Sequence, residues 1–293
     1  MHLVLISGLS GSGKSIALNV LEDAGYYCVD NLPSALLPTL IEQLRSEGRS
    51  EVAVAIDVRG GAGIENLPQM VEQLRSGGID TRFLFLDAKD DTLLKRYSET
   101  RRRHPLARDN LTLSEAIREE RDRLEAIANV GHHIDTSDLK AGTLREWVRQ
   151  FIATPPGAGL TLLFQSFGFK HGIPLDADLV FDVRCLPNPH YDPELRPLTG
   201  RDAPVVAFLE AQEEVGRMRD DIFHFVSTWL PNYVRDSRSY LTVAVGCTGG
   251  QHRSVYLVEW LARQFDDGGK PASGDLRVLL RHRELALAPT AQP

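Results

Sequence analysis

The chain has 293 residues, of which 42% are hydrophobic and 25% charged, a composition typical of a globular protein. Because a single hydrophobic core rarely grows beyond about 250–300 residues, this length predicts two domains. The formal net charge of −7 excludes a protein that binds nucleic acid through an overall positive charge, so any RNA contact would need a local basic patch.

The short apolar and longer amphipathic stretches of the first 150 residues alternate. The apolar runs predict strands at Leu3–Ser7, Tyr26–Val29, Glu51–Val58, Thr81–Asp87 and His132–Asp135. The amphipathic stretches predict helices at Lys14–Ala24, Pro33–Arg45, Leu67–Arg75, Leu111–Asn129 and Ala141–Ala153. Thr112 or Ser114 is suited to cap the fourth of these helices. The alternation predicts an α/β fold, a mostly parallel sheet with helices on both faces.

The segment TPPGAG at 154–159 interrupts this alternation, because two prolines and two glycines cannot continue a helix or a central strand. We predict a first domain at 1–153, a linker at 154–160 and a second α/β domain at 161–293. Strands are predicted there at Leu160–Phe167, Ala177–Arg184 and Tyr240–Gly246, and helices at Ala203–Glu214, Asp221–Tyr233 and His252–Phe265.

The three cysteines, Cys28, Cys185 and Cys247, lack the paired spacing of a zinc site and are too few for a disulfide framework. The apolar N-terminus has no preceding basic segment and no cleavage site, and no stretch approaches the roughly 20 apolar residues of a membrane span. The sequence therefore predicts a cytoplasmic protein without membrane association.

The segment GLSGSGKS matches the phosphate-loop pattern G-x-x-x-x-G-K-[ST] at every fixed position and lies between a predicted strand and a predicted helix. Its glycines allow backbone N–H groups to converge on phosphate oxygens. Lys14 would reach the β- and γ-phosphates, and the Ser15 hydroxyl would ligate Mg²⁺, which makes these two the expected catalytic residues. The predicted nucleotide-binding residues are Gly8, Leu9, Ser10, Gly11, Ser12, Gly13, Lys14 and Ser15.

Two other segments of the first domain are candidates for contact with the nucleotide. Asp57 ends a predicted strand, where it could serve Mg²⁺ through water, help recognise the base, or cap a turn. Arg101–Arg103, with Arg96 and Arg108 nearby, concentrates positive charge between a strand and a helix. Such a segment is typical of a lid that closes over a triphosphate, and an ordinary solvated charge run is the alternative.

In the second half, Cys247 and Arg253 are separated by five residues, between a predicted strand and a predicted helix. This is the spacing of cysteine phosphatases, in which a thiolate attacks phosphorus while an arginine holds the phosphate oxygens. No aspartic acid is clearly placed as a general acid, so we favour a phosphate-binding loop over phosphatase chemistry, with a plain strand–turn–helix as the third interpretation. Polar residues that could converge on this loop are Lys170, His171, Asp182, Arg184, Asn188 and His190.

Together these motifs resemble the RapZ/YvcJ family of bacterial nucleotide-binding proteins over nearly the whole chain. The matching segments are GLSGSGKS, DNLP at 30–33, DVR at 57–59, RRRHPL at 101–106, FQSFGFKHGIP at 164–174, DLVFDVRCLPNPHY at 178–191 and GCTGGQHRSV at 246–255.

This resemblance implies binding of ATP and GTP with slow hydrolysis, assembly into oligomers, and a C-terminal domain that senses glucosamine 6-phosphate. Members that act as RNase adapters bind a small RNA and hand it to ribonuclease E. The GTP-linked segment would comprise Asp57, Val58, Arg59 and Gly60. The sugar-phosphate pocket would comprise His171, Arg184, His190, Cys247, Thr248, Gly249, Gly250, His252 and Arg253.

One feature departs from the family. RNA-binding members end in a compact basic tail, whereas residues 276–293 here offer only Arg277, Arg281, His282 and Arg283 before turning neutral, and 268–274 looks inserted. We therefore predict a nucleotide-binding regulator that senses a phosphorylated metabolite, with RNA as a weaker expectation. The rival hypotheses are a small-molecule kinase with an unknown acceptor and an RNA adapter that does not need nucleotide.

Overall fold

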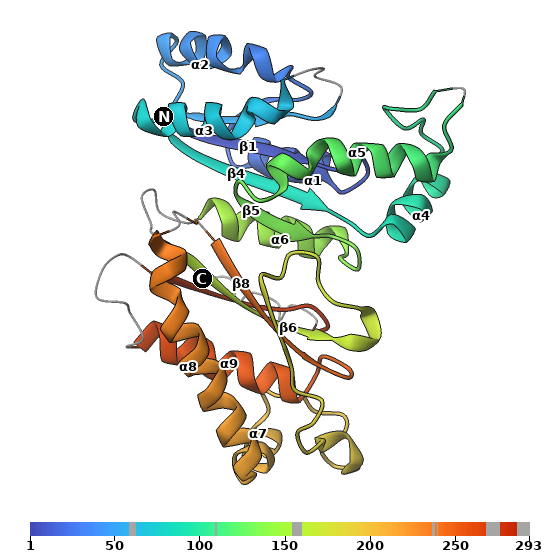
Figure 1. The fold of residues 1–293 in the computed structure, drawn as a ribbon, viewed down its shortest axis with the longest axis vertical. Coiled ribbons are helices and arrows are strands. Elements are labelled where there is room, and N and C mark those ends of the chain that lie inside the picture. Colours follow the sequence, from blue (N-terminus) through green and yellow to red (C-terminus); the bar gives the residue numbers. More distant parts are fainter. Residues whose placement is uncertain are drawn as a thin grey trace. The chain divides into compact units, whose positions relative to one another are not determined.

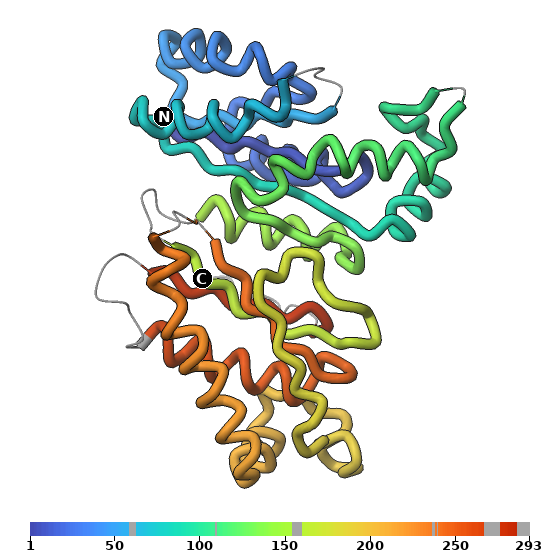
Figure 2. The backbone as a smooth tube through the Cα atoms, viewed as in Figure 1, coloured from blue at the N-terminus to red at the C-terminus, as the bar shows by residue number. Residues whose placement is uncertain are grey.

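The computed structural model describes residues 1–58, 63–108, 110–153, 160–235, 238, 240–267 and 276–285. The chain divides into two compact units, 1–157 and 158–293, and each contains its own sheet. In Figure 2 the first unit runs from blue to green and the second from yellow-green to red. The α/β fold class is thereby confirmed. The predicted linker lies outside the described residues except for Leu160, which is buried, so its bounds stay a prediction.

The first unit is built on a five-stranded sheet in which every pair of neighbours is parallel. Its strands are β1 (His2–Gly8), β2 (Tyr27–Val29), β3 (Glu51–Ala55), β4 (Asp80–Asp87) and β5 (His132–Asp135). The spatial order β2-β3-β1-β4-β5 places β1 at the centre, so the residues that follow β1 have strand ends on both sides (Figure 1).

Helices cover both faces of this sheet, as the alternating pattern predicts. They are α1 (Lys14–Asp23), α2 (Leu37–Ser46), α3 (Leu67–Ser76), α4 (Asp90–Thr100), α5 (Leu113–Ala128) and α6 (Ala141–Ile152), with 3₁₀ turns η1 (Ser34–Leu36) and η3 (Ile64–Asn66). Helix α4 was missing from the prediction, because its first two turns are mostly charged and show little apolar periodicity. Thr112 caps α5 by accepting a hydrogen bond from the Glu115 amide, which resolves the choice between Thr112 and Ser114.

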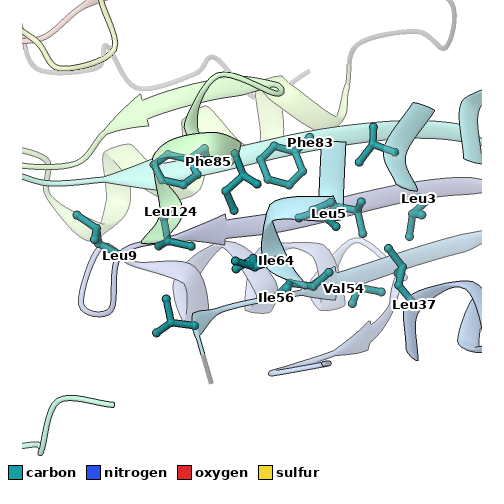
Figure 3. Packing of buried hydrophobic residues seen from close by; sticks show 14 of the residues in the cluster. Leu3, Leu5, Leu9, Leu37, Val54, Ile56, Ile64, Phe83, Phe85 and Leu124 are labelled. Atoms are coloured by element: carbon teal, nitrogen blue, oxygen red, sulfur yellow. The ribbon is translucent and has the colours of Figure 1, made fainter. Parts of the chain in front are cut away.

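One face of the sheet packs against α2, α3 and α5. Alternate residues of the central strands, such as Leu3, Leu5 and Phe83, point into this core together with Leu124 of α5 (Figure 3). On the other side α1 contacts α6, whose Phe151 ring stacks on His132 at 5.6 Å between centroids. Because both faces are covered, functional groups can reach solvent only at the strand ends.

The second unit has four parallel strands in the order β7-β8-β6-β9. They are β6 (Thr161–Gly168), β7 (Leu179–Asp182), β8 (Tyr240–Cys247) and β9 (Arg277–His282). The helices are α7 (Ala203–Glu210), α8 (Glu213–Arg235) and α9 (Arg253–Asp267), with 3₁₀ turns η4 (Phe169–His171) and η5 (Pro189–Tyr191). Their buried residues join β6 and β8 in a second core, where Phe164 and Phe265 lie 5.4 Å apart between ring centroids.

The boundary between α7 and α8 differs from the prediction. The predicted helix Ala203–Glu214 ends at Glu210, and α8 begins at Glu213 rather than Asp221 because Val215 and Ile222 are buried on one face. Within the described ranges, no helix combines the length and apolar character that a membrane span requires.

The four basic residues that the sequence offers near its C-terminus lie in a strand or directly after it. Residues 277–282 form β9, which pairs with β6, so their side chains belong to a sheet. Arg281 is only 3% exposed, and burial lowers its pKa to about 10. The His282 ring contacts Ser166 at 2.7 Å, and Arg283 lies 3.9 Å from Asp176. The strand signal was the apolar run Val278–Leu280 between Arg277 and Arg281. Arg277, Arg281 and His282 are therefore part of the second sheet.

Candidate nucleotide and anion sites

The loop between β1 and α1 is shaped by glycines at two close approaches. Gly8 has a φ of +135°, and a Cβ there would lie 2.0 Å from the Leu86 carbonyl oxygen of β4. Gly13, with a φ of +109°, immediately precedes α1. The loop therefore turns sharply from the central strand so that the positive N-terminal end of α1 faces the loop's interior.

Lys14 and Ser15 lie at the first turn of α1, where the loop pattern needs them. The Lys14 ammonium donates hydrogen bonds to the Gly8 carbonyl at 2.6 Å and the Leu9 carbonyl at 3.1 Å, so the side chain folds back over the loop. Ser15 is exposed. Its hydroxyl is a hard oxygen donor of the kind that Mg²⁺ prefers, so the residues present fit a magnesium-bound triphosphate.

A buried carboxylate holds the loop from beneath. Glu120 of α5 is fully buried, and its two oxygens accept hydrogen bonds from the Ser10 amide at 3.0 Å and the Ser10 hydroxyl at 2.7 Å. The His104 ring lies 3.0 Å from the same carboxylate. Burial alone would raise the pKa of Glu120, but His104, the charge of Lys14 and the Ser10 bonds together lower it. Glu120 is therefore held ionised under the loop.

Sequence reasoning missed this contact, although a signal was present. Glu120 lies three residues after Ile117 and four before Leu124, on the buried stripe of an amphipathic helix. A carboxylate in such a stripe needs partners. The partners come from segments distant in sequence, which no local pattern reveals.

The arginine-rich segment divides into two parts. Arg96 of α4 donates to the Gly11 carbonyl of the loop at 3.0 Å and to the Thr136 hydroxyl at 3.0 Å, so it fastens the loop to the residues after β5. Arg101–Arg103 follow α4 and are exposed, and the next residue, His104, is buried against Glu120. The segment is thus anchored next to the phosphate loop, and its action as a lid stays a prediction.

The GTP-linked segment is only partly described. Asp57 and Val58 are 3% and 5% exposed and follow β3, the strand next to β1. The Ile56 amide donates to the Ile6 carbonyl at 2.9 Å, which brings Asp57 to the same sheet edge as the phosphate loop. Arg59 and Gly60 lie outside the described residues.

A cavity of about 260 Å³ lies beside the phosphate loop. Leu9 and Phe85 form part of its apolar wall. Arg121 of α5 provides its charged wall, bound to both oxygens of Asp87 at 2.9 Å and to Asp90 at 2.9 Å. This space could hold a small polar molecule next to the loop.

The second unit has its own cavity, of about 240 Å³, where β8 ends and α9 begins. It is lined by Lys170, Asn188, His190, Cys247, Thr248, Gly249, Gln251, His252 and Arg253. Six of these nine belong to the predicted sugar-phosphate set. Parallel strand ends and a helix N-terminus thus meet here as they do in the first unit.

Three predicted pocket residues are not in the lining. The Arg184 guanidinium is ion-paired with Asp182 and lies 3.9 Å from the centroid of the Phe169 ring, and these contacts direct it away from the cavity. The Arg184 backbone carbonyl accepts a hydrogen bond from Arg253. The Gly250 amide donates to the Cys247 sulfur. His171 is exposed in η4. Lys170, Asn188 and Gln251 line the cavity instead, because adjacent residues of a loop point in different directions.

The cavity combines cationic and neutral donors. Burial lowers the pKa of His252, whose ring Nε2 lies 3.3 Å from the Leu195 carbonyl. Arg253 is 4% exposed and donates to the carbonyls of Arg184 and Leu186 at 2.8 Å. A fixed guanidinium, the Lys170 ammonium and the Thr248 hydroxyl are the groups that hold a phosphate monoester.

Comparison with known proteins gives matches over both units. Residues 1–155 match the model of the RapZ-like N-terminal domain, and residues 160–286 match the model of the RapZ C-terminal domain. The chain is 65% identical to a "Nucleotide-binding protein" of Dechloromonas aromatica, over 98% of this chain and 99% of the relative. It is 64% identical to one of Aromatoleum aromaticum, over 98% and 96%. A solved shikimate kinase from Bacteroides thetaiotaomicron also matches, at 11% identity and a TM-score of 0.37. The match covers 52% of this chain and 98% of the kinase chain.

The contact between Glu120 and Ser10 predicts the effect of Glu120→Gln on nucleotide affinity. The variant keeps the shape of the side chain but loses the charge that binds Ser10 and His104, and hydrogen bonds to charged groups contribute about 1.5–3 kcal/mol. We expect magnesium–triphosphate affinity to fall about tenfold in a fluorescent-nucleotide titration. Glu72→Gln, an exposed position on α3, is the control. Equal affinity in both variants and the wild type would contradict the assignment.

The same carboxylate predicts a pH dependence of stability. Its pKa in the folded protein is below the ordinary value of 4.5, so its stabilising contribution is complete above that pH and is lost as the pH falls through the lowered pKa. The stability difference between wild type and Glu120→Gln, measured by urea unfolding, should be constant at neutral pH and shrink in acid. A difference that persists unchanged in acid would show that the charge does not stabilise the loop.

Proposed function

Since the chain belongs to the RapZ family of nucleotide-binding proteins, we propose that it is a regulator that couples nucleotide binding to the level of a phosphorylated amino sugar. It binds ATP and GTP with Mg²⁺ at the phosphate loop and hydrolyses them slowly. Its C-terminal unit binds glucosamine 6-phosphate. The observation that carries this proposal is the phosphate loop itself, a strand–loop–helix with Lys14 and Ser15 at the first turn and Glu120 beneath.

The contacts of the loop favour nucleotide binding. Arg96 and Glu120 fasten Gly11 and Ser10, so the loop is preorganised for a triphosphate. The exposed Arg101–Arg103 segment next to it supplies positive charge for the transferring phosphoryl group. In GTP binding, the Asp57 carboxylate would bind Mg²⁺ through a water molecule or would contact the guanine base.

The proposed ligand of the second unit follows from the cavity lining. Arg253, Lys170 and Thr248 suit a phosphate, whereas Asn188 and Gln251 offer the amide groups that sugar hydroxyls require. The cavity volume of about 240 Å³ is of the size of a monosaccharide phosphate. The remaining part of the proposal, that an oligomer transmits the occupancy of this site to a ribonuclease partner and a small RNA, rests on the family alone.

We propose that any RNA contact uses a surface other than residues 277–283. The cationic residues of 277–283 are built into β9 and its contacts, and in the described part of the chain Arg101–Arg103 form an exposed basic run next to the nucleotide. An RNA contact at that run would compete with its function as a lid.

A small-molecule kinase is the second candidate function, and the cavity beside the phosphate loop is the observation that favours it. An acceptor bound between Leu9 and the Arg121–Asp87 pair would lie next to the loop. Incubation with labelled ATP and a metabolite pool distinguishes the two: stoichiometric transfer of label to a sugar or nucleoside supports the kinase, and release of phosphate alone supports the regulator.

Lys14→Ala tests the nucleotide site. Removal of the ammonium should weaken magnesium-dependent binding of ATP and GTP by at least about tenfold, because a charge-assisted contact to phosphate is lost. Isothermal titration with each triphosphate, with and without Mg²⁺, measures the change, and Lys140→Ala is the exposed control. Unchanged affinity in Lys14→Ala would refute the proposed site.

Arg253→Ala tests the sugar-phosphate site. The wild type should bind glucosamine 6-phosphate in isothermal titration, and the variant should bind at least about 100-fold more weakly, since a buried guanidinium contact to a phosphate is removed. Arg263→Ala, an exposed arginine on the same helix, should bind like the wild type. Absence of heat in all three proteins would end the sensor hypothesis while leaving the nucleotide site intact.

A further inference from the structure

The cavity of the second unit contains a thiol where a phosphate would bind. Strand β8 ends at Cys247 and α9 begins at Arg253, so the five intervening residues form a loop with the cysteine at one end and the arginine at the other. Both side chains line the same cavity. The sequence spacing alone left three interpretations open, and the contacts of the two side chains separate them.

The Cys247 sulfur is surrounded by hydrogen-bond donors. The Gly250 amide donates to it at 3.2 Å, and the Ser254 hydroxyl, fully buried, lies 3.2 Å away. Burial alone would raise the pKa of Cys247, but the Ser254 and Gly250 bonds and the charge of Arg253 lower it below its ordinary value. A purely structural cysteine in an apolar core would show the opposite shift, so this environment favours the nucleophilic thiolate.

Arg253 has one anchored side and one side available to a ligand. Its Nη1 donates to the carbonyls of Arg184 and Leu186 at 2.8 Å, and its Nη2 lies 3.3 Å from the Thr248 hydroxyl. Its Nε is buried and has no hydrogen-bond partner among the described residues. The Nε–Nη2 edge of a guanidinium matches two oxygens of a phosphate, and a bound phosphate would satisfy the buried Nε.

We propose that Cys247 is the nucleophile of a phosphomonoester hydrolase activity in this cavity, with Arg253 holding the phosphate and Ser254 positioning the sulfur. The inference rests on the proposed phosphate-binding function of the same cavity. The thiolate attacks phosphorus, an S–P bond forms as the P–O ester bond breaks, and the leaving oxygen takes a proton from His190, which lines the cavity. Water then attacks phosphorus and returns a proton to His190, and the S–P bond breaks to regenerate the thiolate and release inorganic phosphate.

The experiment uses the full-length protein with para-nitrophenyl phosphate and glucosamine 6-phosphate as probes. We expect phosphate release by the wild type and a phosphate adduct on the Cys247 peptide after rapid quenching. Cys247→Ser should lose at least about 100-fold in the rate of phosphate release and should form no adduct at residue 247. Cys185→Ser, an exposed cysteine outside the cavity, is the control. Ser254→Ala should shift the pH–rate profile to higher pH, which a merely structural serine would not do.

The outcomes separate this inference from the sensor proposal. Binding by the wild type without phosphate release and without adduct overturns the hydrolase inference and leaves the sensor proposal standing. Absence of binding overturns both. Phosphate release that persists in Cys247→Ser overturns the assignment of the nucleophile.

Discussion

Both units depend on one arrangement, in which a buried parallel strand ends in a small-residue turn and a helix begins with its N-terminus over that turn. The arrangement concentrates unpaired N–H groups and the positive end of a helix dipole at one point. In the first unit the strand is β1 and the helix α1, and in the second they are β8 and α9. Both cations donate to two backbone carbonyls, but they differ in shape: Lys14 carries a point charge, whereas Arg253 has a planar guanidinium. A point charge can serve several oxygens of a triphosphate, and a guanidinium fork suits the paired oxygens of a single phosphate.

Glu120 connects the first of these turns to the rest of its unit. A buried carboxylate is costly unless it is paired, and its partners here are the Ser10 peptide and the His104 ring. Nucleotide binding at the loop and the position of the exposed arginines are therefore linked through one side chain. This linkage is the physical basis on which occupancy of the loop could be communicated to the surface of the unit.

The sequence predicted what local pattern can determine. Apolar runs and amphipathic stretches located ten strands and helices of the first unit to within a few residues, and the phosphate loop was recognisable from Gly8, Lys14 and Ser15. The sequence did not predict α4, because its first turns are mostly charged. It also did not predict β9, because the pairing of its residues with β6 cannot be read from the local pattern. Arg184, predicted for the anion cavity, does not line it, because its guanidinium is bound to Asp182 in a contact that spacing does not reveal. Glu120 was missed because its partners lie up to 110 positions away.

We propose that backbone amides at the two turns hold the phosphates. Hydrogen exchange of residues 8–15 and 247–253, followed by mass spectrometry, measures those amides directly. We predict that ATP with Mg²⁺ slows exchange in residues 8–15 and that glucosamine 6-phosphate slows exchange in residues 247–253. Neither ligand should change exchange in the interior of the helix that follows the other segment. Exchange rates at both turns that are unaltered by saturating ligand would contradict the account.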